Sequence, residues 1–136
     1  MTLAREAMVA EPAALDAQAS AAEAGERLAQ PDVRAVLVCD EGRLVGVVTR
    51  TTLVREVVAA RRDPSATRLG EIAEAPRFTI EADMPVDEAF QLLEEHDLER
   101  VPVVEDGKLV GVLSRSVLQR RLAEDEPPEL EDQQQV

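Results

Sequence analysis

Two polar pairs in this chain have the residue types and the setting of an anion-binding site. Thr49-Arg50 and Ser114-Arg115 each follow an apolar run and precede a stretch of helical character. The first amides of a helix lack partners within the helix, and together with the helix dipole they favour an anion. A hydroxyl at the cap position and a neighbouring guanidinium add further donors. Both pairs are therefore candidates to hold a phosphate or another small anion.

The same residues also have an explanation that needs no ligand. Thr49 and Ser114 can simply cap the helices that they begin. Arg50 and Arg115 can lie in solvent or pair with nearby acids, as most exposed arginines do. The sequence alone leaves both explanations open.

Catalysis and metal binding have little support in the sequence. We find no Ser/His/Asp order, no Walker-type loop and no Gly-x-Gly-x-x-Gly. The carboxylates are scattered, and His96 has no second His or Cys nearby to complete a metal site. Cys39 is the only cysteine and lies in an apolar run, which indicates an inert, buried thiol and excludes an intrachain disulfide. We expect a protein that is not an enzyme and holds no metal.

The two polar pairs occupy equivalent places in an internal duplication. Residues 42–55 (GRLVGVVTRTTLVR) and 107–120 (GKLVGVLSRSVLQR) are identical at eight of fourteen positions, at a constant offset of 65 residues. Agreement at a fixed offset over this length is the signature of a repeat. The chain is therefore expected to consist of two copies of one structural unit.

Hydrophobic periodicity and turn residues predict the same order of elements in each copy. The first copy is expected to contain a short helix from Thr2 to about Met8, an extended segment at 13–15, a helix from Ser20 to before Pro31, strands at 35–39 and 44–48, and a helix from Thr49 to about Arg61. The second is expected to contain a helix at 67–73, a strand at 78–80, a helix from Pro85, strands at 101–104 and 109–113, and a helix from Ser114. Glu-Gly and Asp-Gly between paired strands are strong hairpin signals, because Gly supplies the positive φ.

These elements predict an α+β fold of tandem β-α-β-β-α repeats. A three-stranded sheet with two helices leaves one face uncovered, so the repeats should pack through their small sheets with pseudo-two-fold symmetry. We expect a first repeat at 1–60, a linker at 61–66, a second repeat at 67–123 and an acidic, disordered tail at 124–136.

Composition restricts the partners and the compartment. The net charge of the 136 residues is −13, from 28 acidic and 15 basic side chains, which repels nucleic acid and anionic membrane surfaces. No apolar stretch approaches the roughly 20 residues that span a bilayer, and the first residues lack a signal-peptide core. We expect a cytoplasmic protein with an aliphatic core, since the chain has two Phe and neither Trp nor Tyr.

The most specific segments, residues 100–107 (RVPVVEDG) and 111–116 (GVLSRS), resemble those of the CBS (cystathionine β-synthase) domain. Two such domains in tandem are similar to a CBS pair, or Bateman module, over about residues 2–122. The resemblance implies a flat, often disc-like homodimer with clefts between the repeats. Such clefts commonly bind AMP, ADP, ATP, S-adenosylmethionine or dinucleotides, and binding regulates an attached or partner protein.

The resemblance also assigns residues to these clefts. The base would lie against Phe78, Thr79 and Pro102 in the second repeat, and against Ala13, Ala14 and Leu37 in the first. Thr49 and Ser114 would offer hydroxyls to phosphate, with Arg50 and Arg115 beside them.

The chain departs from the family pattern at one position in each repeat. Nucleotide-binding members usually have an acidic residue three positions after the Thr or Ser, where it binds the ribose hydroxyls. Here those positions carry Thr52 and Val117. A hydrogen bond to a charged acceptor contributes roughly 1.5–3 kcal/mol, so ribose recognition should be about tenfold to a hundredfold weaker. Thr52 can still bond a hydroxyl, whereas Val117 cannot.

Two functions follow as hypotheses. The first is a regulatory module that binds an adenine-containing or other small anionic ligand between its repeats. The alternative is a ligand-independent module for dimerisation or protein interaction, which the two missing acids and the acidic tail favour.

Overall fold

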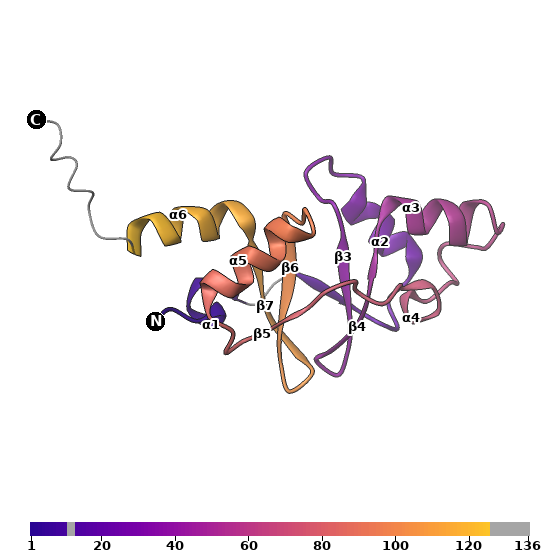
Figure 1. Cartoon of the computed structure of the whole chain (residues 1–136). Coiled ribbons are helices and arrows are strands. Elements are labelled where there is room, and N and C mark those ends of the chain that lie inside the picture. Colours follow the sequence, from indigo (N-terminus) through magenta and orange to yellow (C-terminus); the bar gives the residue numbers. More distant parts are fainter. Residues whose placement is uncertain (11–12, 126–136) are drawn as a thin grey trace, which may run out of the picture.

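The computed structural model describes residues 1–10 and 13–125 (Figure 1). The helices are α1 (Ala4–Ala7), α2 (Ala21–Leu28), α3 (Arg50–Leu53), the π-helical turn η1 (Val54–Val58), α4 (Leu69–Ile72), α5 (Val86–Glu95) and α6 (Arg115–Asp125). The strands are β1 (Val9–Ala10), β2 (Ala14–Asp16), β3 (Val36–Asp40), β4 (Arg43–Val48), β5 (Ile80–Glu81), β6 (Arg100–Glu105) and β7 (Lys108–Ser114). Among the described residues, no helix has the length and apolar content needed to cross a bilayer.

Each repeat contributes three strands to one mixed sheet, in the order β2-β3-β4-β7-β6-β5, and β1 pairs with β7. Within a repeat, the first strand is parallel to the second and the second is antiparallel to the third. The β-α-β-β-α order predicted from the sequence is confirmed in both copies. Figure 1 shows the two copies side by side, with their longer helices on the same side of the sheet.

Both hairpins turn through two residues with positive φ. Asp40 pairs with Arg43, which leaves Glu41 (φ 53°) and Gly42 (φ 82°) as the loop. The second loop has the same conformation, with φ 54° at Asp106 and 82° at Gly107. Positive φ at both positions defines a type I′ turn, whose twist matches that of the strands. The predicted hairpins are therefore confirmed.

The two repeats meet where these hairpins lie side by side. Arg43 pairs with Lys108, the residue 65 positions later. The amide of Leu44 donates to the carbonyl of Gly107 at 3.2 Å, and that of Leu109 donates to the carbonyl of Gly42 at 3.0 Å. The donor and acceptor residues of one bond correspond to those of the other at the 65-residue offset of the repeats. The predicted pseudo-two-fold axis therefore passes through this contact. The two small sheets are thereby joined edge to edge.

Several element ends differ from their predicted positions. The strand predicted at 78–80 is β5, so Phe78 and Thr79 precede it; the Phe78 ring stacks on His96 instead of joining the sheet. The first helix is also shorter than predicted and its cap position is Leu3. Its predicted start, Thr2, accepts a hydrogen bond from the amide of Val86 through its carbonyl (2.9 Å) and so belongs to the contact with α5. The predicted tail at 124–136 overlaps the end of α6, and its residues after Asp125 lie outside the described part of the chain.

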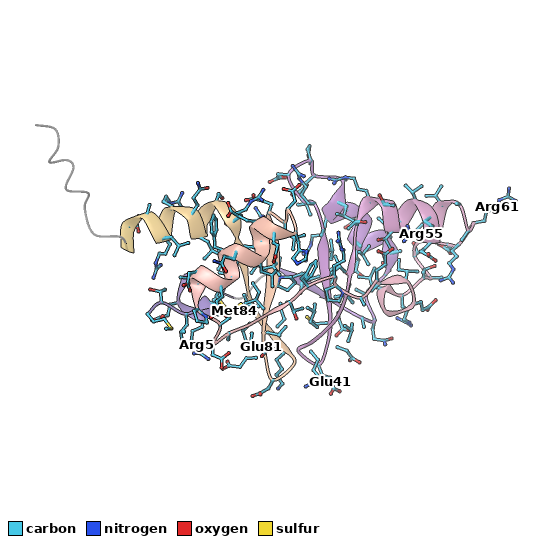
Figure 2. The ribbon with its side chains drawn as sticks, viewed as in Figure 1. Arg5, Glu41, Arg55, Arg61, Glu81 and Met84 are labelled. Carbon is cyan, nitrogen blue, oxygen red and sulfur yellow. The ribbon has the colours of Figure 1, made fainter. Side chains whose placement is uncertain are left out.

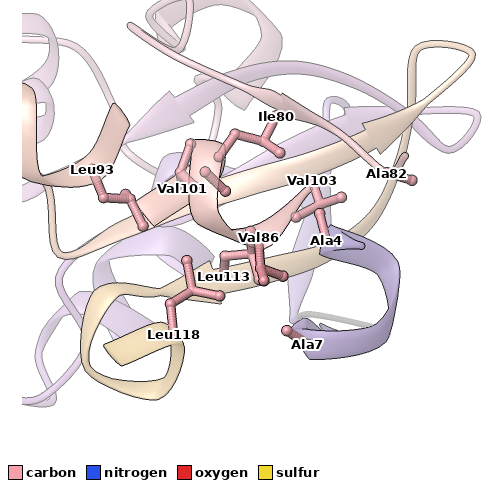
Figure 3. Close-up of a cluster of buried hydrophobic side chains, with 11 residues drawn as sticks. Ala4, Ala7, Ile80, Ala82, Val86, Leu93, Val101, Val103, Leu113 and Leu118 are labelled. Carbon is pink, nitrogen blue, oxygen red and sulfur yellow. The ribbon is translucent and has the colours of Figure 1, made fainter. Parts of the chain in front are cut away.

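The leading helices are exchanged between the repeats. Ala4 and Ala7 of α1 are buried in the core of the second repeat, among Val86, Leu113 and Leu118 (Figure 3). Leu69 and Ile72 of α4 are buried in the core of the first repeat. Each core of the described chain is thus completed by a helix that precedes the other repeat.

Backbone hydrogen bonds fix this exchange and repeat the same symmetry. The amide of Ala4 donates to the carbonyl of Met84 at 2.8 Å, and that of Leu69 donates to the carbonyl of Ala19 at 2.9 Å. Val9 then pairs with Val112, as Glu74 pairs with Val47. The crossing segments are therefore hydrogen-bonded to the sheet of the opposite repeat.

The crossing requires glycine in the strand beneath it. A Cβ at Gly46 would lie 2.6 Å from the Cβ of Ala73 and 2.9 Å from the carbonyl oxygen of Glu74. A Cβ at the equivalent Gly111 would lie 2.9 Å from the carbonyl oxygen of Val9. These distances are shorter than a van der Waals contact. At Gly46 two of the three nearest atoms are backbone, which moves only with its whole segment, whereas at Gly111 the two nearest atoms belong to the flexible side chain of Met8.

We predict that Gly46→Ala lowers the free energy of unfolding by about 1–3 kcal/mol, because the added methyl overpacks the crossing. Gly25→Ala is the matched control: its Cβ would lie 3.8 Å from Leu53 Cδ1, an ordinary contact. Within α2 the control should gain about 0.5–1 kcal/mol. Urea denaturation measures both, and equal effects of the two substitutions would contradict the proposed role of the crossing.

Candidate functional site

Thr49 and Thr52 form a reciprocal cap at the start of α3. The Thr49 hydroxyl accepts a hydrogen bond from the amide of Thr52 (3.2 Å), and the Thr52 hydroxyl accepts one from the amide of Thr49 (3.0 Å). The two hydroxyls are 3.1 Å apart and share a further bond. Thr52 is fully buried. The structure brings these two predicted residues together, and the Thr52 hydroxyl is used within the cap.

Arg50 lies beside this cap with an exposed guanidinium. Its Nη2 donates to the backbone carbonyl of Gln30, just beyond the end of α2, at 2.8 Å. Arg50 forms no ion pair with any residue in the described part of the chain. The carbonyl positions the side chain without neutralising it, so its positive charge remains available to an anion.

The equivalent Arg115 has a different environment. Its Nη1 lies 3.3 Å from Asp97 Oδ1, and its Nε lies 3.8 Å from Glu99 Oε1. Ser114 caps α6 by accepting a hydrogen bond from the amide of Val117 at 3.2 Å. The second repeat therefore keeps the cap but places two carboxylates against its arginine, which weakens any attraction for an anion.

The predicted apolar residues lie on the strands leading to these caps. In the first repeat Ala14 of β2 pairs with Leu37 of β3, and both are half-buried. In the second repeat Pro102 of β6 pairs with Val112 of β7 and is also half-buried. Ala13 directly precedes β2 and is exposed. The sheet thus brings Ala14 and Leu37 into direct register.

Phe78 and Thr79 stand just before β5. The Phe78 ring stacks on the imidazole of His96, with centroids 4.2 Å apart and planes inclined by 29°, and the guanidinium carbon of Arg77 is 5.5 Å from the Phe78 centroid. Thr79 is exposed. One side of the only aromatic ring predicted for the site is therefore already occupied by His96.

Two open hollows lie on the surface, and the first of them adjoins the site, because Gln30, whose carbonyl holds Arg50, is part of its lining. One is lined by Leu15, Glu23, Glu26, Arg27 and Gln30, and the other by Gln91, Glu94 and Glu95. The first lining carries two carboxylates and one arginine and the second carries two carboxylates, so both are net acidic and neither favours an anion. Neither is lined by a predicted site residue.

Cys39 is half-buried in β3, in register with Asp16 of β2. Burial raises the pKa of the Cys39 thiol, and the charge of the Asp16 carboxylate raises it further. A thiol with a raised pKa is less often ionised at neutral pH and is a poor nucleophile. This agrees with the inert thiol expected from the sequence.

The family model for the CBS domain matches twice, at residues 4–59 and 69–124, which together cover most of the chain. The chain belongs to the CBS domain family. Each match begins with one of the exchanged helices and ends with the helix that the Thr or Ser caps, so the two CBS repeats coincide with the observed duplication.

Individual CBS proteins are similar along almost their whole length. Hypoxic response protein 1 of Mycobacterium tuberculosis is 30% identical over 125 residues, which are 91% of this chain and 87% of the relative. A crystal structure of Hypoxic Response Protein I with two coordinated zinc ions superimposes with a TM-score of 0.74 at 29% identity, covering 89% of this chain and 99% of that one. The crystal structure of CBSX2 in complex with AMP has a TM-score of 0.71 at 23% identity, covering 91% and 98%.

The zinc ions of Hypoxic Response Protein I have no matching group of ligands among the described residues of this chain. Among the described residues, no three His, Cys, Asp or Glu side chains are grouped so that they would hold a metal ion. His96 is stacked on Phe78 and Cys39 lies in β3, in the other repeat. The donor set of the described residues therefore does not fit a zinc site within one chain.

Sequence reasoning missed the partners that distinguish the two arginines of this CBS pair. Gln30 contributes a backbone carbonyl, which no residue type signals. Asp97 and Glu99 carry a signal that alignment of the repeats would have given: the equivalent first-repeat positions are Asp32 and Arg34, so one acid is added in the second repeat.

We predict that Thr49→Ala lowers the free energy of unfolding by about 1 kcal/mol (0.5–2), because the cap of α3 is lost. Thr51 lies two residues further along and is exposed, so Thr51→Ala should change the free energy of unfolding by less than about 0.5 kcal/mol. Chemical denaturation of both variants tests this. A negligible effect of Thr49→Ala would show that the hydroxyl does not hold the cap in solution.

We also predict that Cys39 in the folded protein reacts with iodoacetamide more slowly than a free cysteine at neutral pH, and that the rate rises only at higher pH. The raised pKa keeps the thiol protonated. Asp16→Asn should accelerate the reaction modestly, since burial, the larger cause, remains. Protein unfolded in urea provides the control, and equal rates in the folded and unfolded protein would refute the prediction.

Proposed function

We propose that this CBS pair is a regulatory module that binds a small anionic ligand, of the adenine-containing class (AMP, ADP, ATP or S-adenosylmethionine), between its repeats. The family is one of regulatory and generally non-catalytic modules. The observation that carries the proposal is Arg50, an exposed guanidinium held in place by a backbone carbonyl and left without an ion pair among the described residues.

In this proposal the first repeat contributes the main contacts. Arg50 receives the phosphate or carboxylate group, supported by the cap that Thr49 forms. The paired strands at Ala14 and Leu37 offer apolar surface to a base. The equivalent groups of the second repeat, Phe78, Thr79, Pro102, Ser114 and Arg115, form a weaker counterpart.

The AMP complex of CBSX2 supports the ligand class, since a protein of this fold there binds an adenosine phosphate. Affinity for a ribose should nonetheless be modest here. Thr52 and Val117 occupy the positions at which an acid would accept bonds from the ribose hydroxyls, and Thr52 is buried. We further propose that the module is cytoplasmic and acts as a homodimer on a partner protein.

The deciding experiment is isothermal titration of the protein with AMP, ATP and S-adenosylmethionine. We expect binding that weakens about tenfold to a hundredfold in Arg50→Ala, because a charge-assisted contact is lost. Arg115→Ala is the matched control and should change affinity far less, since Asp97 and Glu99 already pair with that arginine. Absence of heat and of any thermal shift at millimolar ligand would reject the proposal.

The alternative function is a ligand-independent module for dimerisation or protein interaction. It is favoured by exposed apolar side chains on the segment after Thr49: Val54 and Val58 are 58% and 69% exposed. Unchanged self-association with and without nucleotide, together with silent titrations, would support it.

A further inference from the structure

The short segment between α5 and β6, residues 96–99, contacts two of the side chains assigned to the second-repeat site. The imidazole of His96 stacks on the Phe78 ring, with the ring centroids 4.2 Å apart. The carboxylates of Asp97 and Glu99 lie 3.3 and 3.8 Å from the guanidinium of Arg115. The 96–99 segment therefore contacts both the ring expected to receive a base and the cation expected to receive a phosphate.

Glu99 also occupies two further donors at the start of α6. Its backbone carbonyl accepts a hydrogen bond from the amide of Arg115 at 2.7 Å, and its Oε2 accepts one from the hydroxyl of Ser116 at 3.3 Å. The first amides of a helix are the donors that a bound anion would otherwise receive. Glu99 thus stands where an anion would bind at this helix start.

The end of α5 fixes the path of the 96–99 segment. The amide of Asp97 donates to the carbonyl of Glu94 at 3.2 Å, and Asp97 has φ 52°. The amide of Leu98 donates to the carbonyl of Leu93 at 2.8 Å. These two bonds around a left-handed residue form a Schellman motif. Backbone bonds place the segment, so substitution of its side chains should leave its path unchanged.

The first repeat has different side chains at the equivalent positions. Those of His96, Asp97 and Glu99 correspond to Pro31, Asp32 and Arg34. Pro31 has no aromatic ring, and Arg34 puts a base where the second repeat has an acid. The shared fold therefore requires neither the ring nor both acids of the 96–99 segment.

We propose that the 96–99 segment is an internal substitute for a ligand and closes the second-repeat site. The His96 imidazole takes the place of a base on Phe78, and the carboxylates of Asp97 and Glu99 take the place of a phosphate on Arg115. The inference rests on the proposed function, because it concerns the second of two equivalent sites. The wild-type chain then binds one adenosine phosphate, in its first repeat.

This closure is reversible because its contacts are individually weak. The side chains of Asp97 and Glu99 are 92% and 56% exposed. Exposed ion pairs and a single ring stack each contribute little to stability. Removal of the competing groups should therefore open the site without unfolding the chain.

Titration with AMP tests the closure in a chain carrying Arg50→Ala, which weakens the first repeat. The segment is opened by adding His96→Ala, Asp97→Gly and Glu99→Gln. Glycine suits the left-handed φ at 97, and glutamine keeps the backbone carbonyl that binds the Arg115 amide. We expect AMP to bind the opened chain about tenfold to a hundredfold more tightly than the Arg50→Ala chain. Adding Arg115→Ala to the opened chain should remove this gain.

The matched control changes the net charge by the same amount at other positions. Glu41→Gln and Glu88→Gln remove two exposed carboxylates that form no ion pair with a described residue. Figure 2 shows Glu41 at the tip of the β3–β4 hairpin, and Figure 1 shows the loop between α5 and β6 at the opposite end of the strands. In the Arg50→Ala chain this control should change the affinity for AMP by less than about twofold.

Two results of the titration would overturn the closure. One is an unchanged affinity in the opened chain, and the other is a gain that persists when Arg115→Ala is added. The wild-type chain tests the proposed function separately. Absence of AMP binding there rejects the first-repeat site, whereas Arg115-dependent binding to the opened chain would still support the closure.

His96 is the only histidine of the chain, so its ring protons report the state of the segment directly. In the free protein, stacking on Phe78 should shift their NMR resonances upfield relative to those of a Phe78→Leu variant. AMP that fills the wild-type first repeat should leave the resonances in place. In Glu99→Gln they should move toward free-histidine values as a second equivalent of AMP binds. Resonances that move while the wild-type first repeat fills, or that stay stacked when Glu99→Gln binds a second equivalent, contradict the proposal.

Discussion

The close approach of the crossing segments to Gly46 and Gly111 is the constraint on which the rest of the structure depends. At each of these positions, the segment that leads into the opposite repeat crosses the sheet and hydrogen-bonds to it. The crossing places α1 over the second core and α4 over the first. The caps at Thr49 and Ser114 follow directly after these strands, so the candidate site inherits its position from the crossing.

The hairpins, the caps and the repeat order were predictable because each rests on local chemistry. Glu41-Gly42 and Asp106-Gly107 specify type I′ turns by themselves. The sequence could not predict which core α1 or α4 covers. Ala4 and Leu69 are apolar and could be buried equally well in either core. The unequal environments of Arg50 and Arg115 depend on groups that are distant in sequence, and only the folded chain brings them together.

The two repeats share the same backbone framework, whereas several of their surface side chains differ. Backbone bonds of the exchange recur at an offset of 65 residues, and so do the turns and the caps. The groups that could recognise another molecule differ between the repeats. Arg115 pairs with two carboxylates whereas Arg50 pairs with none among the described residues, and the exposed Val54 stands where the second repeat carries Gln119. The two repeats thus share one backbone frame and present different side chains on it.

The exchanged helices have a consequence for how stability is shared. Without α1, the second core exposes the apolar surface that Ala4 and Ala7 cover, and without α4 the first core loses Leu69 and Ile72. Neither repeat can therefore acquire its native interior before the other begins to form. Although the described chain has two hydrophobic clusters, it should unfold in one thermal transition. A substitution that destabilises one cluster should therefore lower the stability of the other as well.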